Sequence, residues 1–390
     1  MAENTLTGLI PSLYKGLDTV SRELTGYIPS VFRDTSAEQA AVNEPVTFPI
    51  TPAGNVSDIT PAMQVPEPTG QTIGNNSITI TKSRAAEFGF VGEAKLGLDN
   101  GPGYNVVQAD MFAQALRALT NEVETDLAVA AAAGASRAVG APNTPLFATN
   151  IDSLSQMGKV LSDNGAPLSD RQMVIDTTTG AALRTLYGIN DDRDWSKMPF
   201  GDQGILASPH GVAIRETGQP VAHTAGDGAS ATTDNAGYAV GSTAITLASA
   251  GTGAILAGDV ITFAGDARQY VVVTGDADVS GGGSITIQSP GLMQAIPTSA
   301  TAITIVDNTG SDYDVGGVAF YRNAIALAAR APALPEGGDT ASDRMVMTDP
   351  RSGLAFTVAV YKGYHKVRFD VSLAWGVKVL QERHTALLIY

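Results

Sequence analysis

The sequence of 390 residues contains no cysteine, which excludes disulfide bonds, thiolate metal sites and a cysteine nucleophile. Long hydrophobic runs are also missing, because no apolar stretch approaches the roughly 18 to 20 residues of a membrane-spanning helix. The N-terminal stretch lacks the basic start and the continuous apolar block of a signal peptide. We therefore expect no membrane partner and a product that stays in the cytoplasm where it is made.

Positive charge and aromatic side chains are scarce. The chain has 24 Lys and Arg against 39 Asp and Glu, which gives a formal net charge of -15. A surface of this sign repels nucleic acid and anionic lipid on average, although a local basic patch can persist. Aromatic residues make up 6% of the chain, whereas its 42 Gly and 20 Pro favour many turns and short strands over a helical bundle.

Residue types that carry out catalysis form no recognisable motif. No serine lies in a G-x-S-x-G elbow, and no Walker loop is present. The stretches "GDGASA" at Gly226 and "GTGAIL" at Gly251 neither follow a clear strand nor open a helix, so we interpret both as hairpin turns. The histidines have no metal-ligand spacing and are expected to be surface or packing residues; they are His210, His223, His365 and His384.

Four aspartates could in principle hold calcium, namely Asp259, Asp266, Asp276 and Asp278. They lack the odd-position spacing and the closing Glu of a calcium loop, so we expect solvated turn residues instead. The sequence thus predicts no catalytic, cofactor-binding or metal-binding residue, and no enzyme.

The first part of the chain is predicted to be extended. Residues 1–43 are interpreted as a partly helical N-terminal arm that lies on a neighbour, with a frayed terminus as the alternative. Residues 44–95 begin with six prolines, which restrict a strand to an edge, and continue with alternating residues such as Ile78 and Ile80. This pattern predicts a long exposed hairpin, or else an ordinary edge hairpin. A long arm of this kind has too little core to be stable alone.

A long helix should follow over 105–137, with a length of about 50 Å at about 1.5 Å per residue. Asn105 and Gln108 have the spacing of a capping box at its start. One apolar stripe comprises Phe112, Leu116, Leu119, Val123, Leu127 and Ala130, and the opposite face carries Gln114, Arg117, Asn121 and Glu124. Such a helix serves better as a spine than as one wall of a pocket.

The rest of the chain alternates in character. Residues 150–215 predict a compact α+β segment with a helix, a strand and a second helix. From 217 to 312, five short alternating segments between Gly- and Asp-rich turns predict a separate, inserted all-β barrel or sandwich. Residues 217 to 321 contain nine Asp but only one basic residue other than His, Arg268. The remaining residues turn basic and form alternating strands; within "AFYRNAIALAARAP" we favour a turn at Arg322 and a buried strand, with a helix as the alternative.

Three stretches carry a family resemblance. "AFYRNAIALAARAPALP" is similar to a family segment with the pattern Phe-x-Arg-x-Ala followed by Arg and Pro, here Phe320, Arg322, Ala324, Arg330 and Pro332. "GDVITFAG" resembles the central strand of an insertion domain, and "RFDVSLAWGVKVLQERHTALL", with Gly376, resembles closing strands. Together they resemble the tailed-bacteriophage major capsid proteins with the HK97-type fold, closest to the branch of the phage P22 coat protein.

The resemblance implies an α+β, HK97-like capsid fold with an extended hairpin arm, a long spine helix, an α+β axial core and an inserted small all-β barrel. The expected divisions are an N-terminal arm (1–43), the hairpin or E-loop with peripheral strands (44–104), the spine helix (105–140), the first part of the axial core (141–216), the β-barrel (217–312), and the second part of the axial core with peripheral strands (313–390). The hairpin would lie across an adjacent subunit.

The resemblance also implies a function as the coat protein that self-assembles into the icosahedral shell around a phage double-stranded DNA genome. Its partners would be copies of itself in hexamers and pentamers, a scaffolding protein, a portal at one vertex and, without specificity, the packaged DNA. The location would be the virion, after assembly in the host cytoplasm. Two alternatives stay open: a cage of the same fold around cellular cargo, and a β-rich adhesin or carbohydrate-binding protein. The sequence leaves open the shell size, covalent crosslinking and the presence of a decoration protein.

Overall fold

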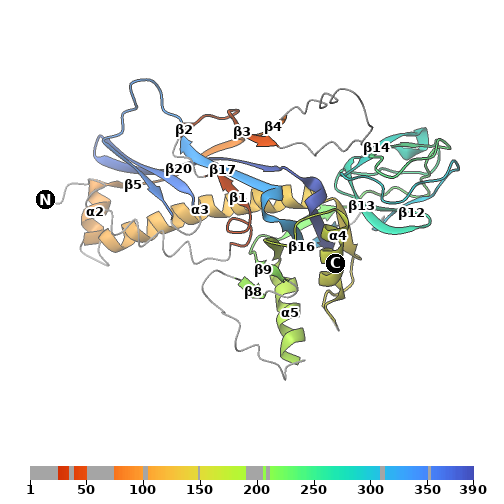
Figure 1. The fold of residues 1–390 in the computed structure, drawn as a ribbon. Helices are drawn as coiled ribbons and strands as arrows, with labels where there is room; N and C mark the ends of the chain where they lie inside the picture. Colours follow the sequence, from red (N-terminus) through yellow and green to blue (C-terminus); the bar gives the residue numbers. More distant parts are fainter. Residues whose placement is uncertain are drawn as a thin grey trace, which may run out of the picture.

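One long helix and two large sheets organise the chain in the computed structural model (Figure 1). The structure describes residues 25–34, 39–50, 74–99, 104–147, 150–189, 205–207, 211–307, 312–349 and 353–390. The fold mixes helices and strands, as the sequence predicts. None of the helices in this part of the chain combines the length and hydropathy that crossing a lipid bilayer requires.

The long helix α3 extends over Tyr104–Ala133 and has 30 residues. The predicted apolar stripe is buried from Phe112 to Leu127. Its last predicted member, Ala130, is only half-buried, and the buried stripe continues instead with Ala131. The prediction of a helix up to residue 137 is wrong, because Arg137–Gly140 forms strand β6 of a sheet. The capping box is also wrong: the Gln108 side chain is buried and its amide has no hydrogen-bond partner among the described residues.

A seven-stranded sheet lies along α3. Its central strand β20 (Lys366–Val379) pairs along one edge with β5 (Lys82–Val91). Along its other edge, the first half of β20 pairs with β19 (Ala355–Gly363) and the second half pairs with β17 (Ile325–Pro332). The remaining strands are β18 (Asp343–Thr348), β1 (Phe32–Asp34) and β2 (Gln39–Ala40), and β5 continues into helix α2 (Gly92–Asp99).

Aromatic rings join α3 to this sheet. The ring centroids of Phe88 on β5 and Phe112 on α3 are 4.8 Å apart, and that of Phe369 on β20 lies 5.3 Å from Phe112. Phe112 and Phe369 are completely buried. Buried aromatic clusters of this kind contribute both apolar burial and favourable ring geometry. The helix and the sheet therefore form one rigid layer pair.

A second sheet contains the rest of the core. Its central strand β16 (Asp312–Tyr321) pairs with β7 (Arg171–Ile175), β21 (Thr385–Ile389) and β10 (Val221–Thr224), and the sheet continues through β9 (Val212–Glu216) to β8 (Ile205–Ala207) and through β21 to β6. Helices α4 (Asp152–Asp163) and α5 (Thr177–Ile189) pack against it, as predicted for this segment. The α4 helix ends at Asn164 and Gly165, the stop signal in the sequence.

All five strands predicted between 217 and 312 are present. They are β11 (Ala244–Leu247), β12 (Val260–Phe263), β13 (Asp266–Thr274), β14 (Gly283–Ile287) and β15 (Ile303–Ile305), with a 3-10 turn η3 at Val279–Gly281. Their buried side chains form an apolar cluster of their own that includes Ile245, Ile261 and Tyr270. Strand β13 also pairs with β6, so this β-rich segment is continuous with the second sheet.

The stretch from Gly316 to Pro332 forms two buried strands. A 3-10 turn η4 at Arg322–Ala324 separates β16 from β17, which confirms the predicted turn and excludes the helical alternative. Residues Ile325 and Leu327 face the large core around α3, while Ala326 and Ala328 face a smaller cluster on the other side of the sheet. A strand buried on both faces is continuously apolar. The C-terminal strands are also confirmed, with a 3-10 turn η5 at Glu382–His384 before β21.

Replacing Gly376 with Ala should destabilise the fold by about 1–3 kcal/mol. A Cβ at this position of β20 would collide with the backbone carbonyl oxygen of Thr79, which lies where β4 (Gly74–Thr79) crosses the sheet. Urea unfolding followed by tryptophan fluorescence measures the change. Gly158→Ala is the matched control, because a Cβ at that position of α4 meets nothing within 4 Å, and Ala is expected to stabilise this helix slightly. Equal midpoints for Gly376→Ala and the unmodified chain would contradict the prediction.

Candidate assembly interface

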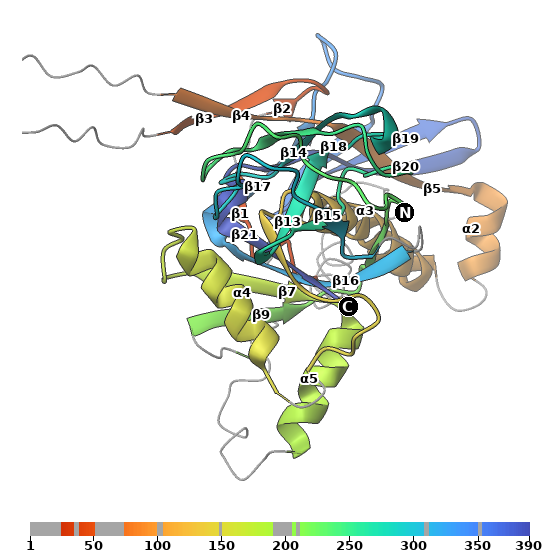
Figure 2. The same ribbon diagram turned by 90° about the vertical axis from the view of Figure 1, so that its right-hand side faces the viewer.

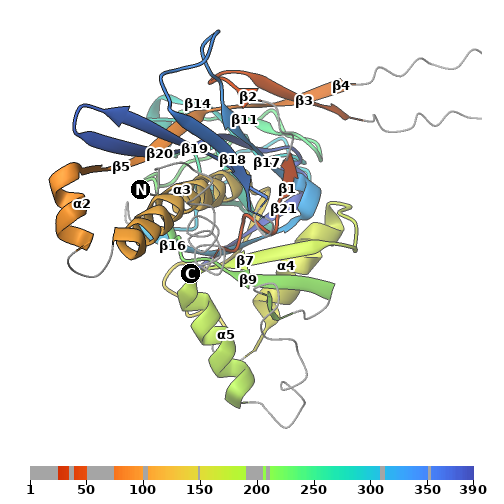
Figure 3. The ribbon, with the colours of Figure 1, turned by 90° about the vertical axis from the view of Figure 1, so that its left-hand side faces the viewer.

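A two-stranded hairpin extends beyond the body of the molecule (Figures 2 and 3). Strands β3 (Pro45–Ile50) and β4 pair antiparallel in register from Pro45 with Thr79 to Ile50 with Gly74. Neither strand pairs with any other strand in the described part of the chain. The predicted hairpin is thus present, and its residues 51–73 lie outside the described residues. A two-stranded ribbon is marginally stable in water unless something covers it.

The base of the hairpin is fixed to the body. Val46, Ile78 and Ile80 are buried in the small cluster with Ala326, Ala328 and Ala374. The Lys378 ammonium of β20 donates hydrogen bonds to Asn76 Oδ1 at 2.7 Å and to the Ser77 carbonyl oxygen at 2.9 Å. The hairpin therefore leaves the body from a defined base, while Thr47, Asn75 and Thr79 remain exposed.

A polar network braces the strand that follows the hairpin. The Lys82 ammonium at the start of β5 lies 2.8 Å from Asp126 Oδ1 and 3.1 Å from Glu122 Oε1, both on α3. The buried Trp375 indole donates a hydrogen bond to the other oxygen of Asp126 at 2.8 Å. These hydrogen bonds raise the pKa of Lys82, with the bond to Asp126 as the main cause. The end of the hairpin is thereby fastened to the spine helix.

Glu124 on α3 is buried, with an exposed fraction of 1%. Its Oε1 accepts hydrogen bonds from the backbone N–H groups of Gly26 (2.6 Å) and Tyr27 (2.7 Å) and from the Thr217 hydroxyl (2.9 Å), and its Oε2 accepts one from the Ile28 N–H (3.0 Å). Burial raises the pKa of this carboxyl, and the four donors act in the opposite direction. The prediction that Glu124 lies on the exposed face of the helix is wrong.

The described part of the N-terminal arm belongs to the subunit itself. Tyr27 is buried and its ring stacks on Phe320 with centroids 6.3 Å apart. Strand β1 then pairs parallel to β17, where the Arg330 guanidinium lies 2.8 Å from Asp34 Oδ2. The expectation that this arm lies on a neighbour is therefore wrong for residues 25–34 and for β2, and residues 1–24 lie outside the described residues.

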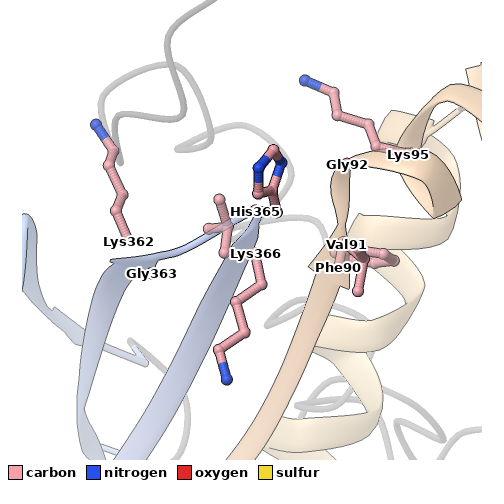
Figure 4. Close-up of a pocket in the computed structure, with 9 residues that line it drawn as sticks. Phe90, Val91, Gly92, Lys95, Lys362, Gly363, His365 and Lys366 are labelled. Carbon is pink, nitrogen blue, oxygen red and sulfur yellow. The ribbon is translucent and has the colours of Figure 1, made fainter.

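A basic surface lies where β5 ends. It surrounds a cavity of about 310 Å³ lined by nine residues: Phe90, Val91, Gly92, Lys95, Lys362, Gly363, His365, Lys366 and Val367. In Figure 4, Lys95, His365 and Lys362 project to one side of the strands, and Lys366 projects to the other. The cavity opens between the β5–α2 junction and the turn that connects β19 to β20. Such an opening suits an anionic group.

Of the residues singled out for chemistry, His223 and Asp259 come together as a pair. His223 Nε2 lies 2.8 Å from Asp259 Oδ1, and Asp259 is completely buried, so its interpretation as a solvated turn residue is wrong. Burial lowers the pKa of His384, which is buried beside Tyr321. His210 lies outside the described residues. No group of three or more His, Asp or Glu side chains within the described ranges is arranged to hold a metal ion.

Comparison with known proteins gives structural neighbours only. No family model and no curated protein matches the sequence. The capsid of the cyanophage P-SCSP1u is 14% identical, with 92% of this chain and 86% of that chain covered and a TM-score of 0.43. The mature capsid of bacteriophage PhiM1 is 11% identical (93% and 86% covered, TM-score 0.42), and a virus-like particle from Pyrococcus furiosus is 10% identical (97% and 96% covered, TM-score 0.38).

Two of these structures are capsids, and one is a virus-like particle. The matches extend over most of both chains in each case. Their TM-scores all lie below 0.5.

Proposed function

We propose that this chain is a major capsid protein with the HK97-type fold, and that its copies assemble into an icosahedral shell around a phage DNA genome. The observation that carries the proposal is the β3–β4 hairpin. It projects from the body, it pairs with no other described strand, and its base is fastened to a rigid pair of helix and sheet. An arm of this kind gains stability by lying on the surface of another copy.

The proposal assigns a role to each part of the chain. The hairpin is the E-loop, α3 is the spine helix, and the sheet around β20 is the peripheral domain that supports them. The part of the second sheet around β16 and β21, with α4 and α5, is the axial core. The strands β11–β15 of the same sheet belong to an inserted β domain over residues 217–312, as in the branch of the phage P22 coat protein. A scaffolding protein and a portal are the further partners in this scheme, and the virion is the location.

Expression of the full chain tests the proposal. We expect closed particles in electron micrographs, either from the chain alone or after coexpression with a scaffolding protein, and a rapidly sedimenting species in the ultracentrifuge. A species that stays strictly monomeric at high concentration under both conditions would refute a shell function. Particles that contain protein cargo in place of DNA would instead identify a cellular cage of the same fold.

A further inference from the structure

The two ends of the molecule differ in charge. One end is formed by the β5–α2 junction and the β19–β20 turn, and the opposite end by strands β12, β13 and β14 (Figure 1). We call the first the basic end and define it by residues 91–96 and 362–366, which include three Lys and one His against a single acid, Glu93. This excess of positive charge stands out in a chain with a formal net charge of -15.

The basic end also presents apolar side chains. Tyr364 is 90% exposed, Leu96 is 66% exposed and Val91 is 50% exposed. Tyr364 lies at the tip of the β19–β20 turn, where the next residue, His365, adopts a positive φ of 55°. The ring centroids of Tyr364 and His365 are 4.3 Å apart. Tyr is among the residue types that dominate binding at protein interfaces.

The opposite end carries negative charge. Residues 225–311, between β10 and β16, contain seven Asp, one Arg, no Glu and no Lys. Two of these aspartates, Asp276 and Asp278, lie in the connection between β13 and β14. Asp276 Oδ1 accepts a hydrogen bond from the Asp278 N–H at 2.9 Å, and Asp278 Oδ1 accepts one from the Ser280 N–H at 3.0 Å. Neither forms an ion pair with any residue that the structure describes. Asp278 is exposed, and Asp276 is half-buried with its Oδ2 beside Gly283.

We propose that the basic end of one copy binds the Asp276–Asp278 connection of a second copy, with Lys362 and Lys95 on the carboxylates and Tyr364 against the adjoining backbone. The inference rests on the proposed function and identifies one of its intersubunit contacts. Charge complementarity favours this occupant, because both halves of the contact are on the chain and lie at its opposite ends. A head-to-tail contact repeats from copy to copy and closes when the rotation between copies permits it.

The test is a double charge reversal, Lys95→Glu with Lys362→Glu, in the full chain. We expect the concentration needed for assembly to rise by about tenfold or more at low salt, because like charges would then face each other across the contact. Sedimentation velocity and electron microscopy measure this, and circular dichroism and the urea midpoint verify that the variant folds. Lys159→Glu on α4 is the control. The Lys159 side chain is 66% exposed and, among the described residues, pairs only with Asp163 four residues away, so its reversal should not affect assembly.

A second reversal identifies the partner surface. Adding Asp276→Lys and Asp278→Lys to the double variant should restore assembly to within about threefold of the unmodified chain, because the charges again become complementary. A folded double variant that assembles like the unmodified chain would overturn this contact, even if it lost affinity for DNA, and would leave the shell function intact. A defect that the second reversal does not repair would also overturn it, provided that circular dichroism and the urea midpoint show the quadruple variant to be folded. If the unmodified chain forms no assembly, the proposed function fails first.

Discussion

A chain in which Asn-Gly replaces residues 47–77 should fold as a subunit but form no closed particles. Val46 and Ile78 lie opposite each other in the hairpin at a hydrogen-bonded position of the ladder, so a two-residue turn can join them without changing the register. Val46 and Ile78 stay in place, and the small apolar cluster at the base of the hairpin is preserved. The truncation therefore removes the projecting arm and little else.

Sedimentation velocity and electron microscopy of the truncated chain measure the effect, and a urea titration measures the stability of the subunit. The truncation also removes Asn76 and Ser77, the two residues to which Lys378 donates hydrogen bonds. Lys378→Gln reproduces this loss with the arm intact and should assemble normally, since an exposed polar contact contributes about 1 kcal/mol or less. Particles of normal yield from the truncated chain would contradict the role assigned to the arm.

Replacing Glu124 with Ala should destabilise the subunit by about 3–5 kcal/mol, the largest single-residue effect that we expect. The change removes the acceptor of three backbone N–H groups and of the Thr217 hydroxyl, all within the core. Glu124→Gln should cost less, about 1–3 kcal/mol, because one oxygen remains while an amide NH₂ now faces a donor. Only the acceptor at one of the two carboxylate oxygens is lost.

Urea unfolding of the two Glu124 variants measures these costs, and hydrogen exchange at the amides of residues 26–28 locates them. Glu122→Gln is the matched control two residues earlier on α3: its side chain is 34% exposed and its ion pair with Lys82 lies near the surface, so its loss should cost about 1 kcal/mol or less. Equal losses for Glu122→Gln and Glu124→Ala would show that the hydrogen bonds to residues 26–28 do not stabilise the fold as described.

Local periodicity predicts much of this fold. The five strands between 244 and 305, the stripe from Phe112 to Leu127 and the turn at Arg322 follow from alternation, spacing and turn residues within a few positions. The end of α3 does not, because Arg137–Gly140 pairs with β21, nearly 250 residues away, and this pairing prevails over the local helical pattern of the alanines. Tertiary pairing of this kind leaves no trace in a short window.

The burial of Glu124 and the location of the basic end are harder to predict from the sequence, for the same reason. The helical periodicity places Glu124 on the face opposite the apolar stripe, which predicts that it is exposed. Its burial is explained by contacts with Tyr27 and Thr217, which are distant in the sequence. The cluster of Lys95 and Lys362 forms because β5 and β19 flank β20, although the two residues are far apart in sequence. The basic composition of the C-terminal region indicates positive charge, but composition alone does not show where on the surface that charge lies.

The pairing of β1 and β2 with β17 has a consequence for the order of events during synthesis. Asp34 emerges from the ribosome early, yet its partner Arg330 follows 296 positions later. The alanines beneath the hairpin base, Ala326, Ala328 and Ala374, are made late as well. Contacts of such long range delay folding until most of the chain is available. A nascent polypeptide thus lacks the platform that orients the β3–β4 hairpin, so the shell assembly proposed above would begin only when translation is nearly complete.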